Sequence, residues 1–111
     1  MHPGPHILHL EDSATDAEII EDHLQGEDNP YVIRRVQTRE DFLDALTEFK
    51  PALVLADYNL PHFDGLSALR IIKKVSPAVP VIIVTGAMSD VAVAELLVEG
   101  AEDYVIKDRL A

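Results

Sequence analysis

Acidic, hydroxyl and amine side chains directly follow four short apolar stretches of this sequence: Glu11 and Asp12, Asp57, Thr85, and Lys107. Three carboxylates brought together make a hard, oxygen-rich site for Mg²⁺. A hydroxyl and an ammonium can hold the non-bridging oxygens of a phosphoryl group. Asp57 could then be the nucleophile that forms an acyl phosphate. The combination predicts phosphoryl transfer, although Thr85 alone could simply end a strand and Lys107 alone could be a solvated surface lysine.

The segment LVLADYNLPHFDG, from Leu53 to Gly65, contains the candidate nucleophile. Its apolar run has no periodic polar break, which is typical of a strand buried on both faces, as in a parallel sheet. The run ends at Asp57, and turn-forming residues follow, of which Asp64 and Gly65 are expected to lead into the next helix. These residues alone leave two interpretations of Asp57: a nucleophile or metal ligand, or a strand-ending aspartate that caps the next turn.

Apolar runs and helical spacing alternate along the chain. Strands are predicted over residues 7–10, 31–36, 53–56, 81–84 and 104–106. Helices are predicted over residues 13–25, from Thr38 to just before Pro51, over residues 66–75 and over residues 89–99. This alternation predicts an α/β fold with a doubly wound, five-stranded parallel sheet. In such a sheet the carboxyl ends of the strands lie along one edge, so residues far apart in sequence can share a crevice.

Local signals predict where the elements end and which faces they bury. Arg34 and Arg35 place their strand at an edge of the sheet, and Gly100 is expected to close the last helix. The expected N-caps are Ser13, Thr38 and Ser89. The buried stripe of the second helix is predicted to consist of Phe42, Leu43, Leu46 and Phe49.

Acidic residues crowd the segment between Glu11 and Asp28, which contains no Lys or Arg. Most of this segment is interpreted as a solvated helix face. The acids near enough to the strand end for chemistry are Glu11, Asp12 and Asp16. The histidines of the first strand and the tail, His2, His6 and His9, are too scattered to favour a shared metal site.

Length and composition bound the class of protein. The chain has 111 residues, of which 48% are hydrophobic, as expected for one globular domain. Its formal net charge of −11 argues against a nucleic-acid surface and against docking on an anionic membrane. Without cysteine it has no disulfide or thiolate metal site. No bilayer-spanning stretch or signal peptide is visible, so a cytoplasmic location is expected.

Four motifs of the chain, HLEDS, LADYNLPHFDG, VIIVTGA and DYVIKD, resemble in sequence and spacing those of the bacterial response-regulator receiver domain. The resemblance covers about residues 6–109. It implies the flavodoxin-like strand order 2-1-3-4-5. It also implies that Asp57 is the phospho-acceptor of a two-component phosphorelay.

The resemblance implies roles for the other site residues as well. The implied Mg²⁺ ligands are Glu11, Asp12, Asp57 and the backbone carbonyl of Asn59, with Asp12 the more direct of the acidic pair. Thr85 would hydrogen-bond the phosphoryl group, and Lys107 would pair with it. Tyr104 matches the switch aromatic, whose side chain turns inward when Thr85 moves toward the phosphate. An ordinary half-buried strand tyrosine is the alternative for Tyr104.

The sequence departs from the family at its C-terminal end. Family members often carry a cis proline after the lysine, whereas Asp108 follows Lys107, so a trans bond and an altered loop path are expected. The family also has a fifth helix, but this sequence stops at Ala111. We therefore expect one receiver domain over residues 1–111, with a flexible lead-in over residues 1–5 and the fifth helix missing or truncated. Apolar surface would then be exposed, as in a segment cut from a longer protein.

The predicted function is that of a phospho-accepting receiver without turnover, from a larger response regulator or hybrid sensor kinase. The parent chain could carry histidine kinase activity. The implied phosphoryl donor is a histidine kinase or a histidine phosphotransfer protein, with Mg²⁺ as cofactor. A homodimer could form through the fourth helix and fifth strand, and neither nucleic acid nor membrane is an expected partner.

Two other functions stay open. One is a receiver-like interaction module that is never phosphorylated, although such a module has no reason to keep mutually repelling carboxylates together. The other is a haloacid-dehalogenase-like phosphatase, which also uses a strand-end Asp, a Thr or Ser and a Lys around Mg²⁺. That chemistry usually needs a second Asp two residues after the nucleophile, where this chain has Asn59.

Overall fold

Five parallel strands form one sheet in the order β2-β1-β3-β4-β5 in the computed structural model, which describes residues 4–24, 31–86 and 90–107. The strands are β1 (His6–Leu10), β2 (Val32–Val36), β3 (Leu53–Asp57), β4 (Val81–Thr85) and β5 (Asp103–Ile106). The helices are α1 (Ala14–Leu24), α2 (Arg39–Glu48), α3 (Gly65–Val75) and α4 (Asp90–Val98). The predicted doubly wound sheet and its strand order are therefore confirmed, and each described boundary lies within two residues of its prediction.

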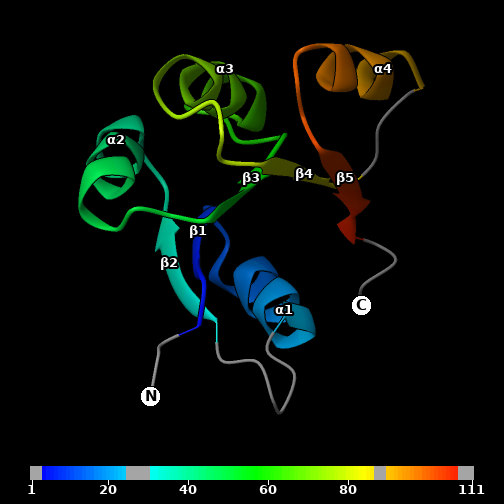
Figure 1. Cartoon of the computed structure of the whole chain (residues 1–111). Coiled ribbons are helices and arrows are strands. Elements are labelled where there is room, and N and C mark those ends of the chain that lie inside the picture. The colour runs from blue at the N-terminus through cyan, green and yellow to red at the C-terminus, as the bar shows by residue number, and fades with distance from the viewer. Residues whose placement is uncertain (1–3, 25–30, 87–89, 108–111) are drawn as a thin grey trace.

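The helices lie on both faces of the sheet. Figure 1 shows α2, α3 and α4 on one face and α1 on the other, where it is the only helix of the described residues. The strand register aligns Leu10 with Ala56, Asp57 with Val84, and Thr85 with Ile106. Because all strands are parallel and in this register, the polar residues at their carboxyl ends reach the same edge.

Two hydrophobic clusters hold these layers together, one on each face of the sheet. The larger includes Leu8, Val54 and Ile83 from the strands together with Phe42, Leu69 and Ile72 from the helices. The smaller consists of Ile7, Leu55 and Val84 with Ile20 of α1. Strand side chains alternate between the two clusters, and both faces are apolar because both carry helices.

The buried stripe of α2 differs from the prediction at one position. Phe42, Ala45 and Phe49 are buried, at the spacing of a single helical face, whereas Leu43 is 36% exposed. One residue along a helix corresponds to a rotation of about 100°, which carries Leu43 away from the face that Phe42 buries. Leu46 is partly buried and packs against the larger cluster. The prediction was wrong for Leu43.

Side-chain caps begin three of the helices. The backbone N–H groups of Asp16, Asp41 and Ser67 donate to Ser13 Oγ (3.1 Å), Thr38 Oγ1 (3.1 Å) and Asp64 Oδ1 (2.9 Å), respectively. Each bond satisfies a first-turn donor that the helix itself cannot pair. Two predicted caps, Ser13 and Thr38, are thus confirmed, while the third, Ser89, lies outside the described residues.

Turns and edges complete the frame. Gly100 follows α4 with φ of 109°, a conformation that favours glycine, as expected for its place at a helix end. The predicted edge position of the second strand is confirmed, since β2 pairs only with β1. Residues 1–3 of the predicted lead-in, the bond from Lys107 to Asp108 and the expected helix truncation lie outside the described residues. None of the helices in the described ranges is long and apolar enough to cross a bilayer.

Candidate functional site

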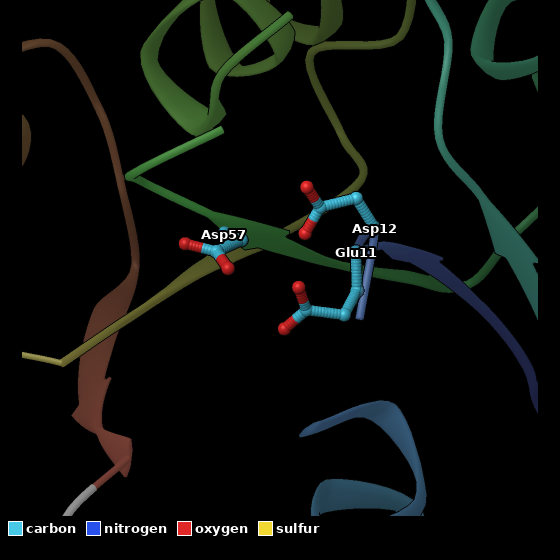
Figure 2. A group of neighbouring side chains, drawn as sticks. All are labelled: Glu11, Asp12 and Asp57. Carbon is cyan, nitrogen blue, oxygen red and sulfur yellow. The ribbon is translucent and has the colours of Figure 1, made fainter. Parts of the chain in front are cut away.

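Three carboxylates meet where β1 and β3 end. Glu11 and Asp12 directly follow β1, and Asp57 is the last residue of β3. Figure 2 shows these side chains together, and one oxygen of each lies within 4.8 Å of one oxygen of the other two. Glu11 and Asp57 are buried, whereas Asp12 is exposed. This cluster offers hard oxygen atoms, two from inside the protein and one from its surface, in the arrangement that a small divalent cation prefers.

The ammonium of Lys107 lies among these carboxylates. Its Nζ is 2.7 Å from Glu11 Oε1, 2.7 Å from Asp57 Oδ2 and 2.8 Å from Asp16 Oδ2. Burial disfavours the charge, but the hydrogen bonds that the ammonium donates to Asp16, Asp57 and Glu11 outweigh it and raise the pKa of Lys107 above its usual range. The lysine therefore stays cationic and acts as the internal counter-charge of the acidic cluster.

Opposing effects act on the pKa of Glu11. Burial raises its pKa to about 7, and the neighbouring Asp57 adds to this effect, while the hydrogen bond to Lys107 opposes it. Its Oε2 also accepts a hydrogen bond from the backbone N–H of Ser13 at 3.3 Å. The close packing of acids at this edge is thus costly for the ion-free protein, and a bound cation would relieve it.

The β3–α3 turn and Lys107 hold the two oxygens of Asp57, and Asn59 of that turn connects the site to β4. Asp57 Oδ1 accepts a hydrogen bond from the backbone N–H of Asn59 at 2.8 Å, while Oδ2 contacts Lys107. The side-chain Nδ2 of Asn59 donates to Thr85 Oγ1 at 2.9 Å. Thr85 is fully buried at the end of β4. The threonine is therefore held beside the carboxylate site through Asn59.

Tyr104 lies on β5 and is not part of the acidic cluster. Its side chain is 37% exposed. It pairs with Ile83 in the register, two residues before the pair of Thr85 and Ile106, so Tyr104 and Thr85 are directed to the same face of the sheet. Its backbone N–H donates to Asp103 Oδ1 at 2.8 Å.

Several contacts of the site were not predicted from the sequence. These are the contact of Asp16 with Lys107, the side-chain bond of Asn59 to Thr85, and a hydrogen bond of 3.1 Å from Arg35 Nη1 to the carbonyl oxygen of Glu11. A signal for Asp16 existed, because a residue in the first turn of a helix that starts at the strand end must lie near the same edge. The side-chain direction of Asn59 had no such signal.

The histidines of β1 do not gather. His6 Nδ1 donates to the carbonyl oxygen of Phe49 at 2.7 Å, and its ring stacks on Phe49. His9 is fully buried, and neither ring nitrogen has a hydrogen-bond partner among the described residues. Burial, with the nearby Lys107 charge, lowers the pKa of His9 to about 4, so its ring is neutral. His2 lies outside the described residues.

The comparison with protein families identifies this arrangement. The model of the response regulator receiver domain matches residues 7–110. The chain belongs to this family. The receiver domain of two-component signalling is thus confirmed as the identity that the motifs around Asp57 and Lys107 predicted.

Curated relatives are longer proteins. A protein-glutamate methylesterase/protein-glutamine glutaminase of Caldanaerobacter subterraneus subsp. tengcongensis is 31% identical over 103 residues, covering 91% of this chain and 28% of the relative. The transcriptional regulatory protein ZraR of Escherichia coli is 32% identical over 106 residues, covering 96% of this chain and 24% of the relative. The receiver chain thus spans about a quarter of the length of these relatives.

Solved receiver domains share the fold. A signal receiver domain from Vibrio parahaemolyticus superposes with a TM-score of 0.81 at 32% identity, covering 96% of this chain and 84% of that chain. The BeF3-activated N-terminal receiver domain of Klebsiella pneumoniae RstA gives a TM-score of 0.80 at 26% identity, covering 92% of this chain and 85% of that chain. These likenesses extend over nearly the whole receiver chain.

Proposed function

We propose that Asp57 accepts a phosphoryl group from a phosphohistidine of a histidine kinase or histidine phosphotransfer protein. The observation that carries this proposal is the position of its carboxylate, which is buried at the end of β3, contacts Lys107 at 2.7 Å and adjoins Glu11 and Asp12. In the reaction an Asp57 oxygen bonds to phosphorus while the bond from phosphorus to the imidazole nitrogen breaks. The leaving imidazole keeps the electron pair and takes a proton from solvent. No turnover is involved, because the domain is its own product.

A divalent cation fits the acidic cluster, and we assign it as Mg²⁺. Glu11, Asp12 and Asp57 would hold the ion, together with the backbone carbonyl of Asn59. Bound Mg²⁺ supplies positive charge that neutralises the oxygens of the transferring phosphoryl group. Support comes from the donor set itself, since one oxygen from each of the three carboxylates lies within 4.8 Å of the others, and the single charge of Lys107 offsets only part of their mutual repulsion.

The residues on β4 and β5 supply the response to phosphorylation. Lys107 already touches the Asp57 carboxylate, so only a short movement is needed to pair it with the added oxygens. Thr85 would donate its hydroxyl hydrogen to the same group. The bond from Asn59 is accepted by the hydroxyl oxygen and does not compete with this donation, but a movement of Thr85 toward the phosphoryl group would break it. Tyr104, on the same face of the sheet, would then turn inward. The switch would thus have two packings. In one, Thr85 is bonded to Asn59; in the other, Thr85 is bonded to the phosphoryl group and Tyr104 is turned inward.

The output surface is assigned to α4 and β5. Val91 and Val98 of α4 are 67% and 87% exposed, an amount of apolar surface that favours association. A homodimer or an effector domain of the parent protein would use this face. We place the domain in the cytoplasm, where phosphorelay partners are found, and propose neither nucleic acid nor membrane as a ligand of the receiver itself.

The test is an intact-mass measurement after incubation with acetyl phosphate and Mg²⁺, comparing the wild type with Asp57→Asn. We expect a gain of one phosphoryl group in the wild type alone. Asp64→Asn is a matched control in the same turn, because Asp64 caps α3 and is not one of the three residues of the acidic cluster. A folded wild type that binds Mg²⁺ but gains no phosphoryl group would indicate an interaction module that is never phosphorylated. Steady phosphate release from small phosphoesters would indicate a phosphatase.

A further inference from the structure

Lys107 has one acidic partner that lies outside the proposed ion site. Of the three carboxylates within 2.8 Å of its Nζ, Glu11 and Asp57 belong to the acidic cluster, and the third is Asp16 of α1. The side chain of Asp16 is 41% exposed, against 1% for Glu11 and 6% for Asp57. Asp16 therefore reaches the ammonium from the solvent side, while the other two face it from inside.

The start of α1 holds Asp16 in this position. Its backbone N–H donates to Ser13 Oγ at 3.1 Å, and the backbone N–H of Ser13 donates to Glu11 Oε2 at 3.3 Å. These bonds, with the contacts of Lys107 to both Glu11 and Asp16, close a ring from the strand end through the helix cap to β5. The contact is thus built into the turn that carries the acidic pair.

We propose that Asp16 is a positioning residue, which anchors Lys107 and offsets its charge so that Glu11 and Asp57 can bind a divalent cation. This inference rests on the proposed function of the same site. A cation held by Glu11, Asp12 and Asp57 would share two carboxylates with Lys107. The ion would not compete for the contact between Asp16 and the ammonium, because Asp16 is not one of the residues that would hold the ion.

Loss of the Asp16 charge should therefore weaken cation binding. The ammonium would depend more strongly on Glu11 and Asp57, and its charge would oppose the incoming ion without compensation. The charge left uncompensated is that of the ammonium, and a unit charge near the ion in largely aqueous surroundings changes the affinity for a divalent ion by about three- to tenfold. The effect should shrink at high salt, because Asp16 is partly exposed.

The first experiment measures Mg²⁺ affinity by isothermal titration calorimetry. We expect Asp16→Asn to weaken binding about three- to tenfold, and Asp16→Glu, which keeps the charge, to restore most of it. Asp22→Asn is the matched control, since Asp22 is an exposed acid on the same helix. In a Lys107→Met background, Asp16→Asn should no longer weaken binding. The proposal would be overturned if Asp16→Asn and Asp22→Asn weakened Mg²⁺ binding equally. It would also be overturned if Asp16→Asn weakened Mg²⁺ binding as much in the Lys107→Met background as in the wild type.

A second experiment tests the contact without any ion. Urea midpoints are measured in EDTA for wild type, Asp16→Asn, Lys107→Met and the double variant. We expect Asp16→Asn to lower the urea midpoint when Lys107 is present. In the Lys107→Met background, where the acidic cluster lacks its ammonium, Asp16→Asn should leave the midpoint unchanged or raise it. Equal shifts in both backgrounds would show that Asp16 does not act through Lys107.

These outcomes are separate from those of the proposed function. A wild type that binds Mg²⁺ but never gains a phosphoryl group on Asp57 contradicts phospho-acceptance, and the calorimetric and urea cycles still decide the role of Asp16. Conversely, a phosphorylated wild type with no coupling between Asp16 and Lys107 overturns this inference alone.

Discussion

Asn59 connects the Asp57 carboxylate to Thr85: its backbone N–H donates to Asp57 Oδ1 at 2.8 Å, and its side-chain Nδ2 donates to Thr85 Oγ1 at 2.9 Å. The backbone bond orients the proposed acceptor, while the side-chain bond holds the threonine that would meet the phosphoryl group. One residue thus contacts both ends of the proposed switch. The two bonds can be separated experimentally, because only one of them uses the Asn59 side chain.

Removing the Asn59 side chain should favour the phosphorylated packing. In Asn59→Ala the Thr85 hydroxyl no longer has to leave this partner, and a neutral hydrogen bond contributes about 1 kcal/mol, or roughly fivefold in an equilibrium constant. We expect Mg²⁺-dependent binding of beryllofluoride to tighten by about that factor, measured by titration. Asn59→Asp is the contrasting variant, since it adds a charge beside the carboxylates and should weaken binding. Tighter binding in Asn59→Asp would contradict this account.

Removing the ammonium should destabilise the ion-free domain. In Lys107→Met the buried carboxylates of Glu11 and Asp57 lose their shared partner, which typically costs about 3 kcal/mol. Urea unfolding in EDTA should show this loss, and millimolar Mg²⁺ should recover part of it by binding the folded state. Lys50→Met, at an exposed position outside the site, serves as the control. Wild-type stability of Lys107→Met in EDTA would show that the lysine does not balance the cluster.

His9 should make the domain sensitive to mild acid. Its pKa is about 4 in the fold, against 6.5 when exposed, so the unfolded chain binds more protons between these values. The contribution of the neutral His9 ring to the free energy of unfolding is fully present above about pH 6.5 and is lost as the pH falls toward 4. The His9→Leu variant should therefore lose less stability than wild type between pH 6.5 and 4.5, by roughly 2 kcal/mol. Parallel pH profiles of the two proteins in urea unfolding would contradict the assignment.

The close approach of α3 to β3 predicts a steric effect on the acceptor. A Cβ added at Gly65 would lie 2.9 Å from the carbonyl oxygen of Asp57 and 3.1 Å from that of Ala56. Because backbone cannot move aside cheaply, Gly65→Ala should cost about 2 kcal/mol and displace the end of β3. Slower phosphoryl gain should accompany the lower urea midpoint. Gly86→Ala, whose added Cβ would meet no atom of the described residues within 4 Å, should leave the midpoint nearly unchanged.

The sequence was enough to predict the sheet and its chemistry because the relevant signals are local. Apolar runs define the strands, and the polar residue at each strand end is brought to one edge by the parallel topology alone, as with Asp57 and Thr85. The register between the strands was not predicted, because strands that are apolar on both faces would still bury their side chains after a slip of one residue. The strand order 2-1-3-4-5 was implied by the family resemblance, and the placement of Lys107 at the same edge as the carboxylates needed no knowledge of side-chain rotamers.

Details that depend on side-chain direction could not be predicted in the same way. Leu43 shares its hydrophobicity with the buried residues of α2 and differs only in its angle around the helix. The direction of the Asn59 side-chain amide depends on the position of Thr85, at the end of the neighbouring strand β4. The start of α1 at its cap, Ser13, was predicted and places Asp16 near this edge, but the direction of the Asp16 side chain toward Lys107 was not.

The internal counter-charge described above has a consequence for the order of events during biosynthesis. Because Lys107 already balances buried acids, the newly made chain can reach its native state while the divalent ion is still absent. Many small metal-binding modules fold only as they capture their ion. Here, Mg²⁺ depletion should silence the domain without exposing its hydrophobic interior, so a starved cell would retain an intact receiver that regains its competence as soon as the ion returns.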